Sequence, residues 1–206
     1  MKVARGSPDS VRVFSELKKY GLLLRTDANL PNVCDLVAGE KVSGSWWAHP
    51  RSHAIFRVDG ELADDPDVLM TKLISGKVTY LHRPLWAPVI AVGRGREPWQ
   101  MEHLSPVARK LLAEVDRKPV QPQPGMSKAT AELETKLLVY SEQFHTESGS
   151  HARRLESWDH WSNRFGYVEG IITPADARLA LEEVVASLNR KFNGGGRLPW
   201  PRSRGG

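Results

Sequence analysis

The stretch VLMTKLISGKVTYLH, residues 68–82, is the part of the sequence that decides the fold. Two runs rich in β-branched and apolar residues flank Ser75 and Gly76, and a two-residue turn with glycine is typical of a β-hairpin. The runs alternate imperfectly between apolar and polar residues, so a helix over residues 67–74 is the alternative. We expect two antiparallel strands, at residues 68–74 and 77–82.

Three short helices are expected before this hairpin. Ser7 and Pro8, a cap residue followed by proline at the first helical position, predict the start of the first helix, and Gly21 ends it. A second helix ends at Gly39, and a third follows Pro50. The order of three helices and a tight hairpin is similar to the winged-helix variant of the helix-turn-helix, in which the third helix enters the major groove.

A proline-rich stretch at residues 117–126 separates the chain into two regions, because three prolines and a glycine cannot continue a helix or a central strand. We find no internal repeat. We expect a mainly α-helical protein with a small β-hairpin, divided into a winged-helix-like helical domain at 1–116, a linker at 117–126, a helical hairpin packing on that domain at 127–192 and a disordered tail at 193–206.

The helical hairpin is expected because apolar side chains recur at steps of three or four from Ser127 to Phe165. This spacing predicts one helix of up to about 38 residues, unless Gly149 breaks it in two. Thr173 and Pro174 then predict the start of a last helix. Each apolar stripe must be buried, so we expect the two helices to pack as an antiparallel pair.

The charge of the chain favours polyanionic partners. Lysine and arginine exceed aspartate and glutamate by five, which gives a formal net charge of +5 and a pI of about 9.4. Long-range attraction to nucleic acid is the consequence to expect from such a charge, although it says nothing about the fold. Part of the excess lies in the final residues, from Arg197 onward.

The residues around the predicted third helix are the candidate nucleic-acid contacts. Arginine can bind guanine through two hydrogen bonds, and tryptophan can stack on an unpaired base. The acidic residues that follow, from Asp59 to Asp67, would repel phosphate, so a winged helix that serves protein contacts is the alternative. We expect the contacts to be Trp47, His49, Arg51, His53 and Lys77, with Trp46 and Arg57 on the same element.

Histidines supply the alternative of an enzyme. His53, His145, Glu147 and His151 are candidates for acid, base or metal-ligand roles in hydrolysis or base modification, provided that at least two of them meet in space. Glu142 and His145 have the Glu-x-x-His spacing of di-metal helical bundles, but the sequence has no second copy. Surface or buried polar roles for these histidines are the plainer interpretation, and we expect no metal and no cofactor.

Other functional classes are disfavoured. The single cysteine, Cys34, excludes an intramolecular disulfide and lies in an apolar run typical of a buried side chain. Residues 93–96 lack the Gly-Lys-Ser/Thr ending of a phosphate loop. No stretch approaches the roughly 18–20 apolar residues that cross a bilayer, so we expect a cytoplasmic protein.

Nucleic-acid binding, in regulation or DNA repair, is therefore the function that we expect from the sequence. An enzyme with a His/Glu cluster between the two halves is the first alternative. A protein–protein interaction module that uses the C-terminal region is the second.

Overall fold

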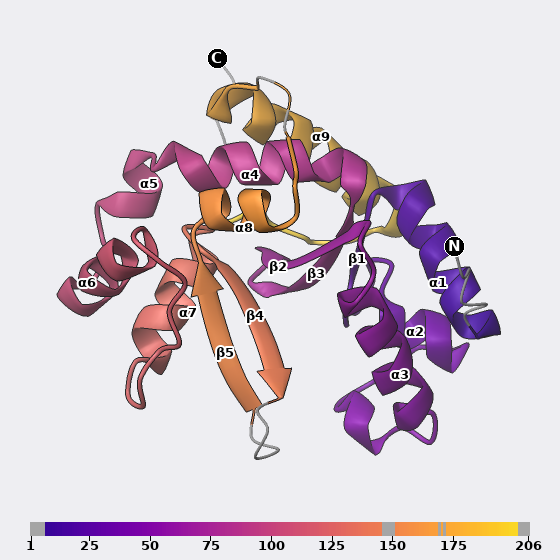
Figure 1. The fold of residues 1–206 in the computed structure, drawn as a ribbon. Helices are drawn as coiled ribbons and strands as arrows, with labels where there is room; N and C mark the ends of the chain where they lie inside the picture. Colours follow the sequence, from indigo (N-terminus) through magenta and orange to yellow (C-terminus); the bar gives the residue numbers. More distant parts are fainter. Residues whose placement is uncertain (1–6, 146–150, 169, 171, 202–206) are drawn as a thin grey trace. The chain divides into compact units, whose positions relative to one another are not determined.

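The computed structural model describes residues 7–145, 151–168, 170 and 172–201 (Figure 1). Helices make up most of the regular structure of these residues, together with two small antiparallel sheets. The chain divides into two compact units, which we call unit 1 (Met1–Trp86 with Leu181–Arg197) and unit 2 (Ala87–Ala180 with Leu198–Gly206). The prediction of a mainly α-helical protein with a small hairpin is confirmed.

Unit 1 combines helices with a three-stranded antiparallel sheet in the order β1-β3-β2. The predicted hairpin is confirmed, and its turn residues Ser75 and Gly76 have positive φ angles of 52° and 68°, as a two-residue hairpin turn requires. Its elements, in chain order, are α1 (Pro8–Tyr20), β1 (Leu22–Leu24), α2 (Val33–Ala38), η1 (Trp46–Ala48), α3 (Ser52–Ala63), β2 (Val68–Ile74), β3 (Lys77–His82) and η2 (Arg83–Leu85).

Two features of this sheet could not be predicted from the sequence pattern. The register of β2 against β3 shifts between Thr71 and Ile74, which accounts for the imperfect alternation. Strand β1 was not predicted, because three leucines directly after a helix show no alternation. Leu22 pairs with Leu81, so β1 is a strand because it completes the sheet beside β3.

The helices of unit 1 start and end as the sequence predicts. The Ser7 hydroxyl accepts a hydrogen bond from the backbone N–H of Ser10, and Gly21, with a φ of 77°, donates its N–H to the carbonyl of Leu17. Helices α1, α2 and α3 bury their apolar sides in one core with the sheet residues Leu23, Val68 and Tyr80. The core fixes which side of each helix remains outside.

Unit 2 is also built on helices and a hairpin. Side chains from α6 and α7 pack with Leu138, Val139 and Leu155 in a second core. The elements that follow η2 along the chain are α4 (Trp86–Gly95), α5 (Pro98–Met101), α6 (Pro106–Val115), α7 (Ser127–Thr135), β4 (Tyr140–His145), β5 (His151–Glu156), α8 (Trp158–Arg164) and α9 (Pro174–Phe192). Helix α9 belongs to unit 1 from Leu181 onward.

The single long helix that we expected from Ser127 is wrong, and with it the C-terminal helical hairpin. Helix α7 ends at Thr135, and the chain then forms the antiparallel hairpin of β4 and β5. Leu137 has a φ of 55°, and a left-handed residue of this kind ends a helix. Residues four apart lie on one face of a strand as well as on one face of a helix. The spacing of the apolar residues therefore did not distinguish a helix from a hairpin here.

The proline-rich stretch at 117–126 is part of unit 2. The N–H of Val120 donates to the carbonyl of Leu155 at 2.9 Å, and the N–H of Leu155 donates back at 2.8 Å. This stretch is therefore an edge of the second sheet, where prolines are tolerated because an edge strand leaves half of its backbone groups unpaired. The boundary between the compact units lies after Trp86 instead.

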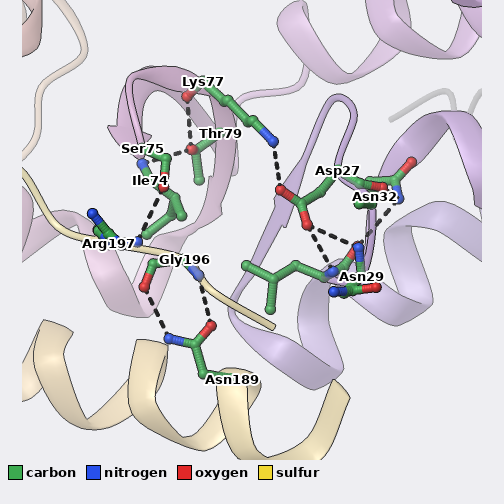
Figure 2. Close-up of polar contacts among 12 residues, drawn as sticks. Asp27, Asn29, Asn32, Ile74, Ser75, Lys77, Thr79, Asn189, Gly196 and Arg197 are labelled. Atoms are coloured by element: carbon green, nitrogen blue, oxygen red, sulfur yellow. Dashed lines mark hydrogen bonds and ion pairs between the residues drawn. The ribbon is translucent and has the colours of Figure 1, made fainter. Parts of the chain in front are cut away.

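The segment that follows α9 is bound to unit 1 (Figure 2). The Asn189 side chain donates to the carbonyl of Gly196 at 2.9 Å and accepts from its N–H at 2.8 Å. The N–H of Ser75 donates to the carbonyl of Arg197 at 2.7 Å. The expected disorder of the tail does not hold for residues 193–201, whereas residues 202–206 lie outside the described part of the chain.

The order of elements in unit 1 recurs in unit 2, although the sequence shows no repeat. Helices α1 and α6 both start with a serine cap and a proline, at Ser7-Pro8 and Ser105-Pro106. Val120 pairs with β5, and β5 pairs with β4, as β1 pairs with β3 and β3 with β2. Equivalent rows of paired residues are Leu22, Leu81 and Leu69 in unit 1 and Val120, Leu155 and Ser141 in unit 2.

The contacts of the tail predict that Gly194→Ala and Gly196→Ala destabilise the protein. A Cβ at either position would overlap the buried Leu30 side chain, and overpacking of this kind costs about 1–3 kcal/mol. Gly195→Ala is the matched control, because its Cβ would meet no atom within 4 Å. Chemical denaturation of the three variants measures the effect, and equal midpoints would contradict the packed tail.

Candidate nucleic-acid interface

Helix α3 presents one exposed stripe of side chains. His53, Phe56, Arg57 and Gly60 are all exposed, and their spacing of three, four and seven places them on one side of the helix. The opposite side carries Ile55, Val58 and Leu62, which are fully buried in the core of unit 1. The stripe therefore holds a histidine, an aromatic ring, an arginine and a position without a side chain, all facing solvent.

A polar network beneath α3 holds this stripe in place. Arg25, which follows β1, contacts the Asp59 carboxylate with Nε at 2.7 Å and Nη2 at 2.9 Å. The Tyr80 hydroxyl of β3 donates to the same carboxylate. Burial raises the pKa of Asp59, and the charge and hydrogen bonds of Arg25 act in the opposite direction. One carboxylate thus joins α3 to two strands of the sheet.

Two tryptophans extend the exposed stripe beyond the start of α3. Trp46 packs against the core of unit 1. Trp47 stacks on Trp46 with ring centroids 3.8 Å apart and an interplanar angle of 26°. Trp47 remains 61% exposed, and its ring lies 5.7 Å from that of Phe56, which is 52% exposed. The pair of adjacent tryptophans therefore divides, one toward the core and one toward solvent.

Three of the expected contact residues already have acidic partners. The His49 ring lies 3.3 Å from Glu40, and only 14% of its side chain is exposed. Arg51 contacts Asp9 at 2.6 Å and donates to the carbonyl of Val37 at 2.6 Å.

Lys77, the first residue of β3, contacts Asp27 at 2.7 Å (Figure 2). Burial opposes ionisation of Asp27, but the hydrogen bonds from Lys77 and from the N–H groups of Asn29 and Leu30 hold its pKa below the usual value. The lysine therefore faces a fully ionised partner at neutral pH. Any contact of Lys77 with phosphate would have to exchange this ion pair.

Acidic side chains limit the interface at the C-terminal end of α3. A cleft of about 850 Å³ opens there, and the Ser10 hydroxyl inside it donates to Glu61. Its ionisable lining residues are Lys18, Glu61, Asp64, Asp65, Asp67 and His82. Four carboxylates against one lysine and one histidine would repel phosphate, so α3 as far as Gly60, together with Trp47, forms the usable surface.

The proposed histidine cluster is only partly within the described residues. His145 and His151 are direct partners at the ends of β4 and β5, but their side chains and the whole of Glu147 lie outside the described part. His53 belongs to unit 1, and the two paired histidines belong to unit 2. The described residues contain no group of three histidine, cysteine, aspartate or glutamate side chains that could hold a metal ion.

The remaining chemical candidates have structural roles in the described residues. Glu142 lies on a strand, so its spacing to His145 does not place the two on one helix face, and its carboxylate contacts Arg154 at 2.6 Å. Burial raises the pKa of the Cys34 thiol to about 12, which keeps it protonated and unreactive at neutral pH.

Phe56 and Gly60 are the residues of this surface that sequence reasoning missed. Their signal is present in the printed sequence, because they share the helical spacing of His53 and Arg57. The signal becomes usable once Ile55 and Val58 are known to face the core, since that choice fixes which side of α3 is exposed.

Arg25→Ala is predicted to destabilise unit 1 in a pH-dependent way. The pKa of Asp59 is raised above 3.8 in the folded state, so the folded protein binds the carboxyl proton more tightly than the unfolded chain does. The free energy of unfolding therefore falls as the pH rises from 3.8 through the folded pKa of Asp59. Loss of Arg25 raises the folded pKa further. We expect a loss of about 1–3 kcal/mol at neutral pH, shrinking below pH 3.8, where Asp59 is protonated in both states.

Urea denaturation at neutral and acidic pH measures this difference. Arg57→Ala is the control, because it removes the same charge from an exposed position of α3. A loss in Arg25→Ala that is equal at both pH values would show that the arginine acts by packing alone.

Comparisons with known proteins identify no family for this chain. No protein-family model matches the chain, and no curated protein matches it. Among solved structures, the chain is similar to the Streptomyces sahachiroi DNA glycosylase AlkZ, at 11% identity and a TM-score of 0.41. The match covers 88% of this chain and 52% of that one, so this chain spans about half its length.

None of the helices in the described residues has the length and apolar character needed to span a membrane.

Proposed function

We propose that unit 1 is a winged-helix module that binds nucleic acid through the exposed stripe of α3. The single observation that carries this proposal is the stripe itself: His53, Phe56, Arg57 and Gly60 face solvent on the third helix of the unit. The order of helices and the strand order β1-β3-β2 support the winged-helix assignment. A helix in this place is the element that enters the major groove in helix-turn-helix proteins.

The chemistry of the stripe suits a base edge and a phosphate backbone. Arg57 contacts Glu61 only at 3.8 Å, with 55% of its side chain exposed, and a surface pair of this kind is easily exchanged for a phosphate or a guanine edge. His53 makes no hydrogen bond or ion pair within the described residues, so both ring nitrogens are available. Gly60 lets a nucleic-acid backbone approach the helix closely.

The cationic residues that already have acidic partners have a smaller role in the proposed binding. Arg51 and Lys77 would contact phosphate by exchanging Asp9 and Asp27 for it, and His49 would do so by exchanging Glu40. Each exchange leaves a carboxylate without its partner, so we expect these residues to contribute less than Arg57. Regulation or repair of DNA in the cytoplasm is the process that we propose for such binding.

Arg57→Ala tests the proposed function. We expect roughly tenfold weaker binding and a smaller salt dependence, because one cationic contact is lost. Fluorescence anisotropy of labelled duplex DNA, single-stranded DNA and RNA at two salt concentrations measures both quantities.

Arg83→Ala is the matched control, because Arg83 is an exposed arginine of the same unit whose ion pair is with Asp67, on the acidic side. It should leave binding nearly unchanged. Absence of binding by the unaltered protein at low salt would contradict the proposed function.

Gly60→Ala separates stability from binding. A Cβ at Gly60 would meet no atom within 4 Å, and replacing an exposed glycine inside a helix by alanine stabilises by about 0.5–1 kcal/mol. We expect a higher melting temperature together with weaker nucleic-acid binding. A more stable variant with unchanged affinity would show that the nucleic acid does not approach α3 at this position.

A further inference from the structure

Trp46 and Trp47 form a two-layer aromatic step at the edge of the α3 stripe. Their ring centroids lie 3.8 Å apart, and the ring planes make an angle of 26°. The centroid distance is shorter than the 4.5–7 Å that aromatic pairs in proteins prefer. The inner ring packs on the core of unit 1, and the outer ring is 61% exposed. The step is therefore rigid on one side and open on the other.

A separation of this size matches the distance between stacked planar rings, so a further flat ring can add to Trp47 as a third layer. Phe56 lies beside Trp47 at 5.7 Å and widens the apolar surface. An apolar surface alone does not identify its ligand, but the side chains next to it do. The exposed side chains that continue the surface along α3 are His53 and Arg57. These side chains suit a ligand in which a flat ring is attached to an anionic backbone.

We propose, on the basis of the proposed function, that this site takes an unpaired nucleobase, so that its preferred substrate is single-stranded or locally unpaired nucleic acid. A base inside a duplex already has stacking neighbours on both sides and cannot cover Trp47. An unpaired base has a free face, and every base can stack on an aromatic side chain because each has a π-face. Arg57 then neutralises the phosphate of the stacked nucleotide or of its neighbour.

The pairing of Lys77 with Asp27 agrees with this substrate class. In a groove-bound winged helix the hairpin contacts the duplex backbone, and here Lys77, the charged residue next to the turn, lies 2.7 Å from the Asp27 carboxylate. The backbone of Ser75 is bound to Arg197 as well. The hairpin turn therefore offers little to a second strand, whereas the aromatic step offers a surface that a single strand can use.

Trp47→Leu tests the inference, with Trp47→Tyr as the variant that keeps an aromatic face. Anisotropy is measured with a labelled oligothymidylate, an oligoadenylate, a duplex of the same length and that duplex with one bulged base. We expect Trp47→Leu to weaken single-strand and bulge binding about tenfold or more and to weaken duplex binding much less, and we expect Trp47→Tyr to retain most of the affinity. Adenine strands should bind more tightly than thymine strands, because purines stack more strongly.

Phe165→Leu is the matched control in unit 2, since Phe165 is also an exposed ring, 45% exposed, packed on a buried tryptophan at 4.8 Å. It should leave all four affinities unchanged. Thermal melting of each variant verifies that it is folded, and a parallel set of RNA strands shows whether the sugar matters to the site.

The outcomes separate the inference from the proposed function. If binding depends on salt and on Arg57 but Trp47→Leu lowers all affinities equally or none, the stacking site is wrong and the proposed function stands. If the unaltered protein binds none of the strands at low salt, the proposed function fails first. A loss in Trp47→Leu that is much larger for unpaired substrates than for the duplex supports both.

Discussion

The position of α3 depends on one partly buried interaction, the contact of Asp59 with Arg25 and Tyr80. Burying a carboxylate is costly unless it is paired and hydrogen-bonded. The arginine and the tyrosine meet that requirement from the end of β1 and from β3, so the helix can lie only where its carboxylate reaches both. Once Asp59 points inward, helical geometry places His53, Phe56, Arg57 and Gly60 outward, and the candidate surface follows.

The same pairing of charges narrows the surface on which binding can occur. Several cations that looked available in the sequence are held by nearby acids: Arg51 by Asp9 and Lys77 by Asp27. The carboxylates around the cleft beside α1 exclude phosphate from the other end of α3. In unit 1, exposed aromatic and cationic groups thus lie together on α3 as far as Gly60, with Trp47 beside them.

The repeated order of elements in the two units shows how far one arrangement can tolerate change in sequence. A leucine row in unit 1 corresponds to valine, leucine and serine in unit 2. The described part of unit 2 has no helix in the place of α2, and a single paired residue, Val120, stands where unit 1 has β1. The two units share the pairing pattern and a Ser-Pro helix start, so their likeness is visible in the structure and not in the residue identities.

The sequence by itself determined the starts and ends of the helices of unit 1, the hairpin at residues 68–82 and the mainly helical class, because caps, glycines and turn residues act locally. It did not determine strand β1 or the packed tail, which depend on partners far along the chain, such as Leu81 for Leu22 and Ser75 for Arg197. It did not determine the hairpin of β4 and β5 either, because the apolar spacing of those residues also fits a helix. For the candidate site, the sequence indicated His53 and Arg57 as residue types that can bind nucleic acid. The stripe that they share with Phe56 and Gly60 was decided only by the tertiary structure, because the core and Asp59 determine which side of α3 is buried.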